Sequence, residues 1–167
     1  GKKHLSPGGV FSQWIHFYGI RSTELKSVIK TFRSVFESVL IFYTDAGDLI
    51  MLGSETPFKI DRNEITRKLS DPAVAKDLAR AEIYSIFDLW AHFILGPNEI
   101  ERFTGDAALN TDDFTLVEFQ TPKSLFEDTM SVHIAEMKGV AAAGEHYLFT
   151  PDESDMVKAA GFYKISE

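Results

Sequence analysis

The sequence contains no cysteine, so disulfide bonds and thiolate chemistry are excluded. It also has no apolar run that approaches the length of a membrane span. Basic residues are in the minority, with 17 Lys and Arg against 25 Asp and Glu, and the net charge is −8. This balance opposes binding to nucleic acid or to an anionic membrane surface. We therefore predict no nucleic-acid partner and no direct membrane contact by this segment.

Several motifs that would mark a chemistry are also missing. The sequence has no G-x-G-x-x-G or G-x-G-x-G nucleotide loop, no G-x-S-x-G nucleophile elbow and no H-E-x-x-H metal motif. His133 and Glu136 lie three residues apart, but no comparable set of metal ligands accompanies them. We predict no catalytic residue, no metal site and no cofactor bound by this chain itself.

Apolar residues, in contrast, are ample for a folded core, since they make up 44% of the chain and include 14 Phe. Pro7 followed by Gly8 and Gly9 predicts a turn. Residues 10–17 come next and are rich in apolar, aromatic and β-branched side chains, as is typical of a well-buried strand. Within this strand, Trp14 is expected to pack in the core.

A helix and a hairpin are expected after this strand. Residues 21–36 have apolar side chains at the spacing of one buried helix face, and Ser22 or Thr23 can cap the start. Two apolar runs separated by residues 45–47 predict a β-hairpin. The pairing that spans the helix can be parallel, whereas the pairing within the hairpin must be antiparallel.

The middle of the chain changes to short helices with recognisable caps. Asp61, Asp71 and Ser85 each stand where an N-cap is expected. The apolar stripe of the third helix extends to Phe93 and Ile94. This region therefore reads as mainly helical.

Three later segments complete the pattern. They are an alternating strand at 114–119, a long amphipathic helix at 123–143 and a last helix at about 151–160. From these shifts we expect three parts: a partial Rossmann-like sheet unit at 1–56, a helical extension with a polar loop and a strand at 57–122, and a C-terminal helical segment at 123–167.

Five stretches resemble the C-terminal part of spermidine-synthase-like proteins, the polyamine aminopropyltransferases and their bacterial homologues fused to a membrane domain. The stretches are LSPGGVFSQWIHFYG, TFRSVF, LIMLGS, DPAVAKDLAR and GDAALNTDDFTLVEFQTP. The resemblance covers residues 5–122. It implies an α/β fold, namely the C-terminal portion of a Rossmann-like, class I methyltransferase-type domain, with a strand, a helix and a β-hairpin followed by a mostly helical region.

The resemblance also implies an activity for the intact protein. This is transfer of an aminopropyl group from decarboxylated S-adenosylmethionine to a polyamine, by attack of an amine on the activated methylene. The donor-binding loop and the catalytic base are implied to precede this segment, so the chain alone is expected to be inactive. The implied location is cytoplasmic, either as a free protein or as a domain attached to a membrane segment.

Two groups of residues are candidates for binding the acceptor. Gln13 lies on the first strand, where its amide can bind an amine or simply a neighbouring loop, and Tyr18 can line the same pocket. Asn110, Asp112 and Asp113 form a polar cluster whose paired carboxylates suit an ammonium group. The same residue types also make the turns that such a loop needs. Both interpretations of the loop stay open.

An alternative hypothesis is a non-catalytic interaction module, in which the fold is a scaffold and residues 123–167 bind a partner. We also expect a homo-oligomer, joined near the strand at 10–17 or across a face that a missing part of the fold would cover, because an unpaired apolar strand is a template for another chain. The competing expectation is that the C-terminal helices cover this edge and leave a monomer.

Overall fold

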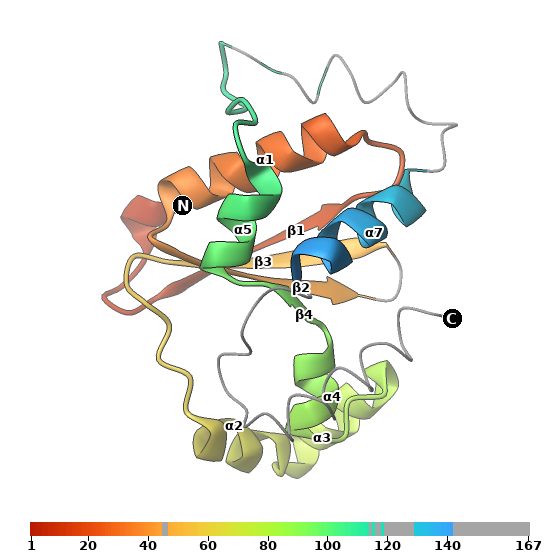
Figure 1. The fold of residues 1–167 in the computed structure, drawn as a ribbon. Helices are drawn as coiled ribbons and strands as arrows, with labels where there is room; N and C mark the ends of the chain where they lie inside the picture. Colours follow the sequence, from red (N-terminus) through yellow and green to blue (C-terminus); the bar gives the residue numbers. More distant parts are fainter. Residues whose placement is uncertain (45–46, 114, 116–117, 119–128, 142–167) are drawn as a thin grey trace. The chain divides into compact units, whose positions relative to one another are not determined.

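The computed structural model describes residues 1–44, 47–113, 115, 118 and 129–141 (Figure 1). The expected helix at 151–160 and most of the expected strand at 114–119 lie outside these residues. The helix predicted at 123–143 is described from Met130 onward, as α7 (Met130–Ala141).

The chain divides into two compact units. The first contains Gly1–Phe58 and Ile94–Gly144, and the second contains Lys59–Phe93 and Glu145–Glu167. The two units do not follow the three consecutive parts predicted at 1–56, 57–122 and 123–167, because the chain returns to the first unit after residue 93.

The sheet has four strands in the order β1-β3-β2-β4 (Figure 1). The strands are β1 (Val10–His16), β2 (Ser38–Thr44), β3 (Asp48–Ser54) and β4 (Phe93–Leu95). β3 pairs antiparallel with β1 on one side and with β2 on the other, so Met51 lies opposite both Gln13 and Ile41. β1 and β2 therefore run parallel to each other with β3 between them. The described chain is a mixed α/β structure with antiparallel pairings.

The register corrects one expectation and confirms another. The hairpin of β2 and β3 is antiparallel, as predicted, and Gly47 supplies the positive φ of 78° that its turn needs. The two strands that flank the first helix are not paired with each other, because β3 is inserted between them. Sequence periodicity carries no information on which strand occupies the middle of a sheet.

Among the described residues, the α-helices of the first unit are α1 (Ser22–Val35), α5 (Pro97–Thr104) and α7. α5 packs against both α1 and α7 (Figure 1). Leu25 and Ile29 of α1 are fully buried, as are Ile41 of β2 and Met51 of β3. The periodicity of residues 21–36 predicted this buried face correctly at Leu25 and Ile29, whereas Val35, which has the same spacing, is exposed at the end of the helix.

A cluster of phenylalanine rings joins α1 to the sheet. The Phe11 ring of β1 stacks on the Phe36 ring at 5.6 Å between centroids, and Phe32 lies 4.9 Å from Phe36. Gly53 of β3 lies beneath this cluster, where a Cβ atom would come within 2.5 Å of the Phe36 ring. The absence of a side chain at Gly53 is therefore what allows the rings to lie against the strand.

β1 is more exposed than its composition suggests. Trp14 is 55% exposed and Val10 is 48% exposed, so the expectation that Trp14 packs in the core is wrong. Alternation along the strand directs Trp14 to the face opposite Phe11, which is the residue that meets α1. Only β3 pairs with β1 among the described strands, and edge strands bury less of each side chain.

The second unit contains short helices. They are α2 (Arg62–Leu69), α3 (Pro72–Leu78) and α4 (Ile86–Ala91), with a 3-10 turn, η2, at Ala79–Ala81; a further 3-10 turn in the first unit is η1 (Lys2–His4). α2 packs against α3 and α4. The predicted caps are confirmed, since the side chains of Asp61, Asp71 and Ser85 each accept backbone N–H groups of the following turn. α4 ends earlier than predicted, because residues 93–95 form β4.

Candidate functional site

A cavity of about 330 Å³ lies in the first unit between β1, α1 and the loop that follows α5. Most of its walls are apolar side chains of β1 and α1, with Met51 of β3. The polar side chains at the cavity are Lys2, Gln13, Thr31 and Asn110, and none of the described residues that line it is acidic. The cavity is in the lower part of the size range of small-molecule sites.

Gln13 reaches this cavity from the edge strand. Its side-chain Nε2 donates to the carbonyl oxygen of Trp14 at 2.8 Å, and the residue is exposed. The contact holds the amide beside its own strand. The sequence left open a structural role for Gln13, in which its amide bonds to a neighbouring loop, and the bond to the Trp14 carbonyl oxygen is of a similar kind. The Gln13 side chain still lines the cavity.

Asn110 reaches the same cavity from the loop after α5. Its backbone N–H donates to Thr31 Oγ1 of α1 at 2.7 Å, and Lys30 Nζ donates to the Gly105 carbonyl oxygen at the start of the loop at 2.6 Å. Two contacts with α1 thus fix the loop. Asp112 and Asp113 follow Asn110 and are exposed to solvent.

The structure therefore brings two of the five predicted residues, Gln13 and Asn110, to one cavity. Tyr18 lies elsewhere, beyond the end of β1, where its ring centroid is 4.9 Å from that of His16. A Cβ atom at Gly47 would lie 3.3 Å from the Tyr18 ring. Asp112 and Asp113 are on the correct loop but do not line the cavity. Whether any of these residues binds an acceptor stays a prediction.

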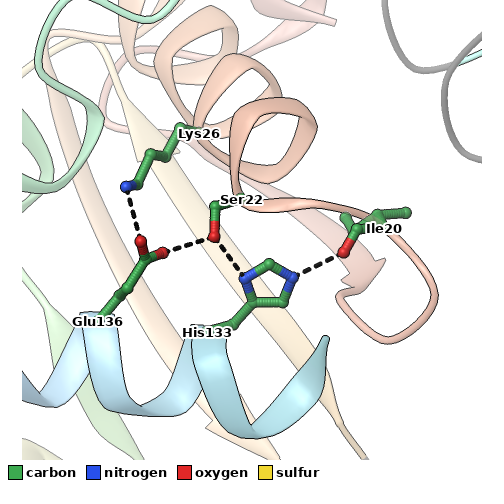
Figure 2. A network of polar contacts seen from close by, with 5 residues as sticks. All are labelled: Ile20, Ser22, Lys26, His133 and Glu136. Carbon is green, nitrogen blue, oxygen red and sulfur yellow. Dashed lines mark hydrogen bonds and ion pairs between the residues drawn. The ribbon is translucent and has the colours of Figure 1, made fainter. Parts of the chain in front are cut away.

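A second polar arrangement joins α1 to α7, and Figure 2 shows its five residues. Ser22 Oγ donates to Glu136 Oε2 at 2.7 Å and lies 3.3 Å from His133 Nδ1. His133 Nε2 donates to the Ile20 carbonyl oxygen at 2.8 Å, and Lys26 Nζ pairs with Glu136 Oε1 at 3.1 Å. We call these five residues the α1–α7 clasp.

Local sequence patterns do not indicate this clasp. They predict Ser22 or Thr23 as a helix cap, but α1 has no side-chain cap, and the Ser22 hydroxyl bonds to α7 instead. The only signal was the three-residue spacing of His133 and Glu136, which places two polar side chains on one face of a helix.

The order of the side chains argues against a hydrolytic triad. In such a triad the imidazole lies between the serine and the acid, whereas here Ser22 lies between His133 and Glu136 (Figure 2). The single Ser22 proton is donated to Glu136, so His133 Nδ1 can bond to the serine oxygen only by donating as well. The arrangement is a structural clasp.

Several effects act on Glu136. Burial raises the pKa of its carboxyl group. Hydrogen bonds from Ser22 and Lys26 and the positive charges of Lys26 and His133 lower the pKa, and together they outweigh burial. The pKa of Glu136 therefore lies below the ordinary 4.5. A lowered pKa in the folded state contributes stability above the unfolded value, and this contribution is lost as the pH falls through the folded value.

Replacing Glu136 with Gln should therefore destabilise the protein at neutral pH and make little difference in strong acid. Urea unfolding between pH 3 and pH 7 measures this, and the stability curves of Glu136→Gln and the unchanged protein should converge below the ordinary pKa of 4.5. Glu64→Gln is the control, because Glu64 forms an exposed pair with Lys68 and such pairs contribute little. Parallel curves across the whole range would contradict the role given to Glu136.

Comparisons with known proteins give no family for the chain: no family model matches it, and the searches of curated proteins and of solved structures found no match. Within the described ranges, no helix is long and apolar enough to cross a membrane. The same residues contain no group of three or more His, Asp or Glu side chains placed to hold a metal ion.

Proposed function

We propose that the chain is the acceptor-side portion of an aminopropyltransferase-like protein with a Rossmann-like, methyltransferase-type sheet. One observation carries the fold part of this proposal: β1 and β2 run parallel, α1 connects them, and β3 lies antiparallel between them. A strand, a helix and a β-hairpin in this order are what the resemblance implies for the C-terminal part of such a domain. Three of the five stretches that resemble spermidine-synthase-like proteins, LSPGGVFSQWIHFYG, TFRSVF and LIMLGS, lie on β1, α1 and β3.

The cavity supports the acceptor part of the proposal. Gln13 and Asn110 carry amide oxygens that can accept hydrogen bonds from an amine, and the apolar walls can contact the methylene groups of a polyamine. Asp112 and Asp113 are the nearest carboxylates along the same loop, and a carboxylate forms strong hydrogen bonds with an ammonium group. These residues would bind and orient the acceptor.

No donor site is part of the proposal for this chain. Decarboxylated S-adenosylmethionine needs groups for its ribose and adenine, and the sequence has no glycine-rich nucleotide loop. The aminopropyl transfer, and a cytoplasmic location, are proposed for the intact protein.

The proposal predicts that Asp112→Asn/Asp113→Asn weakens spermidine binding. A hydrogen bond to a charged group contributes about 1.5 to 3 kcal/mol, which is a loss of roughly 10- to 150-fold in affinity. Isothermal titration of the chain with spermidine measures the change. The matched control is Glu64→Gln/Asp77→Asn, which removes two exposed carboxylates from other helices and changes the net charge equally.

An equal loss in both double variants would mean that only bulk charge attracts spermidine, and the acceptor site would be wrong. Unchanged affinity with a lower melting temperature would show that Asp112 and Asp113 only build the loop. Either result would remove the support that this loop gives to the proposed function.

An interaction module is the second candidate, and the exposed edge of β1 is the observation that favours it. Trp14 and Val10 are about half exposed there. Of residues 123–167, to which the alternative assigns partner binding, the structure describes only 129–141.

A further inference from the structure

The outer edge of β1 has a definite hydrogen-bonding pattern. The Phe17 N–H donates to the Gly47 carbonyl oxygen at 3.0 Å, which continues the register of β1 with β3. In an antiparallel pair, alternate residues direct both backbone groups to the same partner. The odd-numbered residues of β1 therefore bond to β3, and the even-numbered ones direct their N–H and C=O groups outward. The bond from Gln13 Nε2 to the Trp14 carbonyl oxygen agrees with this assignment.

β1 also lacks the features that protect an edge strand. Edge strands commonly carry charged side chains or proline, or are interrupted by a bulge. The sequence of β1, VFSQWIH, has no Lys, Arg, Asp, Glu or Pro, and its pairing with β3 runs without interruption from Val10 to His16. Trp14 and Val10 expose about half of their surface beside the outward backbone groups.

The strand is complementary to a second copy of itself. If two β1 strands pair antiparallel about a two-fold axis at Gln13, Ser12 faces the partner's Trp14 and Val10 faces the partner's His16. Both members of each pair are even-numbered, so every outward N–H and C=O group of both strands can pair. No two like charges meet, although the chain carries a net charge of −8. On the helix-covered face, Phe11 meets the partner's Ile15.

We propose that the chain forms a two-fold symmetric dimer through antiparallel pairing of β1 with β1 of a second copy, with Gln13 on the axis. The pairing joins the two sheets edge to edge and covers part of Val10 and Trp14. A two-fold contact of this type uses the same surface on both subunits and closes at two copies. The dimer uses the edge of β1 on which the larger sheet of the proposed function would continue. The inference therefore concerns this chain by itself, and a β1–β1 dimer of the intact protein would count against that sheet.

Cysteine cross-linking tests the register directly, because the chain has no cysteine of its own. Gln13→Cys places two thiols at the axis, in a non-hydrogen-bonded pair with Cα atoms about 4.5 Å apart, which a disulfide can bridge. It should give a covalent dimer under mild oxidation. Val10→Cys is the control, because six residues of offset separate its two copies by about 20 Å and no disulfide can form.

A second variant tests the backbone contacts. In Ser12→Pro, the lost N–H is an outward one, so the pairing with β3 is kept while the dimer loses hydrogen bonds. Sedimentation should show a dimer for the unchanged chain at micromolar concentration and a dissociation constant at least about tenfold higher for Ser12→Pro. If Ser12→Pro does not fold, Ser12→Lys gives the same test by charge.

Three results would overturn the inference. The first is cross-linking of Val10→Cys as readily as Gln13→Cys. The second is association that Ser12→Pro leaves unchanged, which would place the contact elsewhere. The third is a monomer in which the amides of Ser12 and Trp14 resist hydrogen exchange, which would mean that another part of the same chain covers the edge.

Discussion

Replacing His133 with alanine is expected to lower the free energy of unfolding by about 3 kcal/mol or more. His133 is 1% exposed, and its ring meets the edge of the Phe17 ring at 6.0 Å between centroids. The substitution leaves a cavity at this contact. It also removes the donor for the Ile20 carbonyl oxygen and the neighbour of Ser22 in the α1–α7 clasp (Figure 2).

Urea unfolding monitored by circular dichroism measures this loss. Val132→Ala is the matched control, because Val132 is the preceding residue of α7, is half exposed, and should change stability by no more than about 0.5 kcal/mol. Hydrogen exchange in α7 provides a second measurement, since loss of the clasp should raise exchange there more than in β2 or β3. Equal stability of the two variants would show that the clasp does not hold α7.

Replacing Gly53 with alanine should destabilise the protein by about 1 to 3 kcal/mol, because the added methyl group overpacks the phenylalanine cluster. A Cβ at this position would lie 2.5 Å from atoms of the Phe36 ring and 3.0 Å from the Phe32 ring. Both rings are also held by Phe11, so neither can move away without disturbing the other contacts.

The same substitution at Gly139 should have the opposite sign. Gly139 lies in α7, no atom lies within 4 Å of the position of its Cβ, and alanine favours a helix over glycine by about 0.5 to 1 kcal/mol. Thermal unfolding of the two variants compares them. A Gly53→Ala variant as stable as the unchanged chain would contradict the close packing of α1 on β3.

Local features of the fold were predictable from the sequence. The caps at Asp61, Asp71 and Ser85 use hydrogen bonds that reach only two or three residues along the chain, so neighbouring residues determine them. The buried face of α1 follows from helical spacing, and the hairpin of β2 and β3 follows from its turn.

Features that depend on distant residues were not predictable in the same way. The position of β3 between β1 and β2 depends on which edges meet, and local patterning is the same for a central strand and an edge strand. The exposure of Trp14 follows from that order. The sequence predicts helix at β4 because Phe93 continues the apolar spacing of α4, and a strand of three residues is too short to show alternation.

In the candidate site, too, residue chemistry was predictable from the sequence, whereas contacts between distant residues were not. Gln13 and Asn110 were chosen for their chemistry, and the structure brings them to one cavity although they are 97 positions apart in the sequence. Ser22 and His133 are separated by 111 positions, and nothing in the sequence near either residue indicates the other. Alternation placed Tyr18 with the site, but the end of β1 carries it beyond the cavity.

The central claim is that this chain holds the acceptor amine but not the nucleotide donor, and an amide-resolved NMR titration tests it most directly. With spermidine, we predict shift changes at Gln13, Asn110, Asp112 and Asp113. With decarboxylated S-adenosylmethionine, we predict none at concentrations where a micromolar site, about −8 kcal/mol, would be filled. Saturable shifts with the nucleotide, or spermidine shifts confined to other residues, would contradict the account.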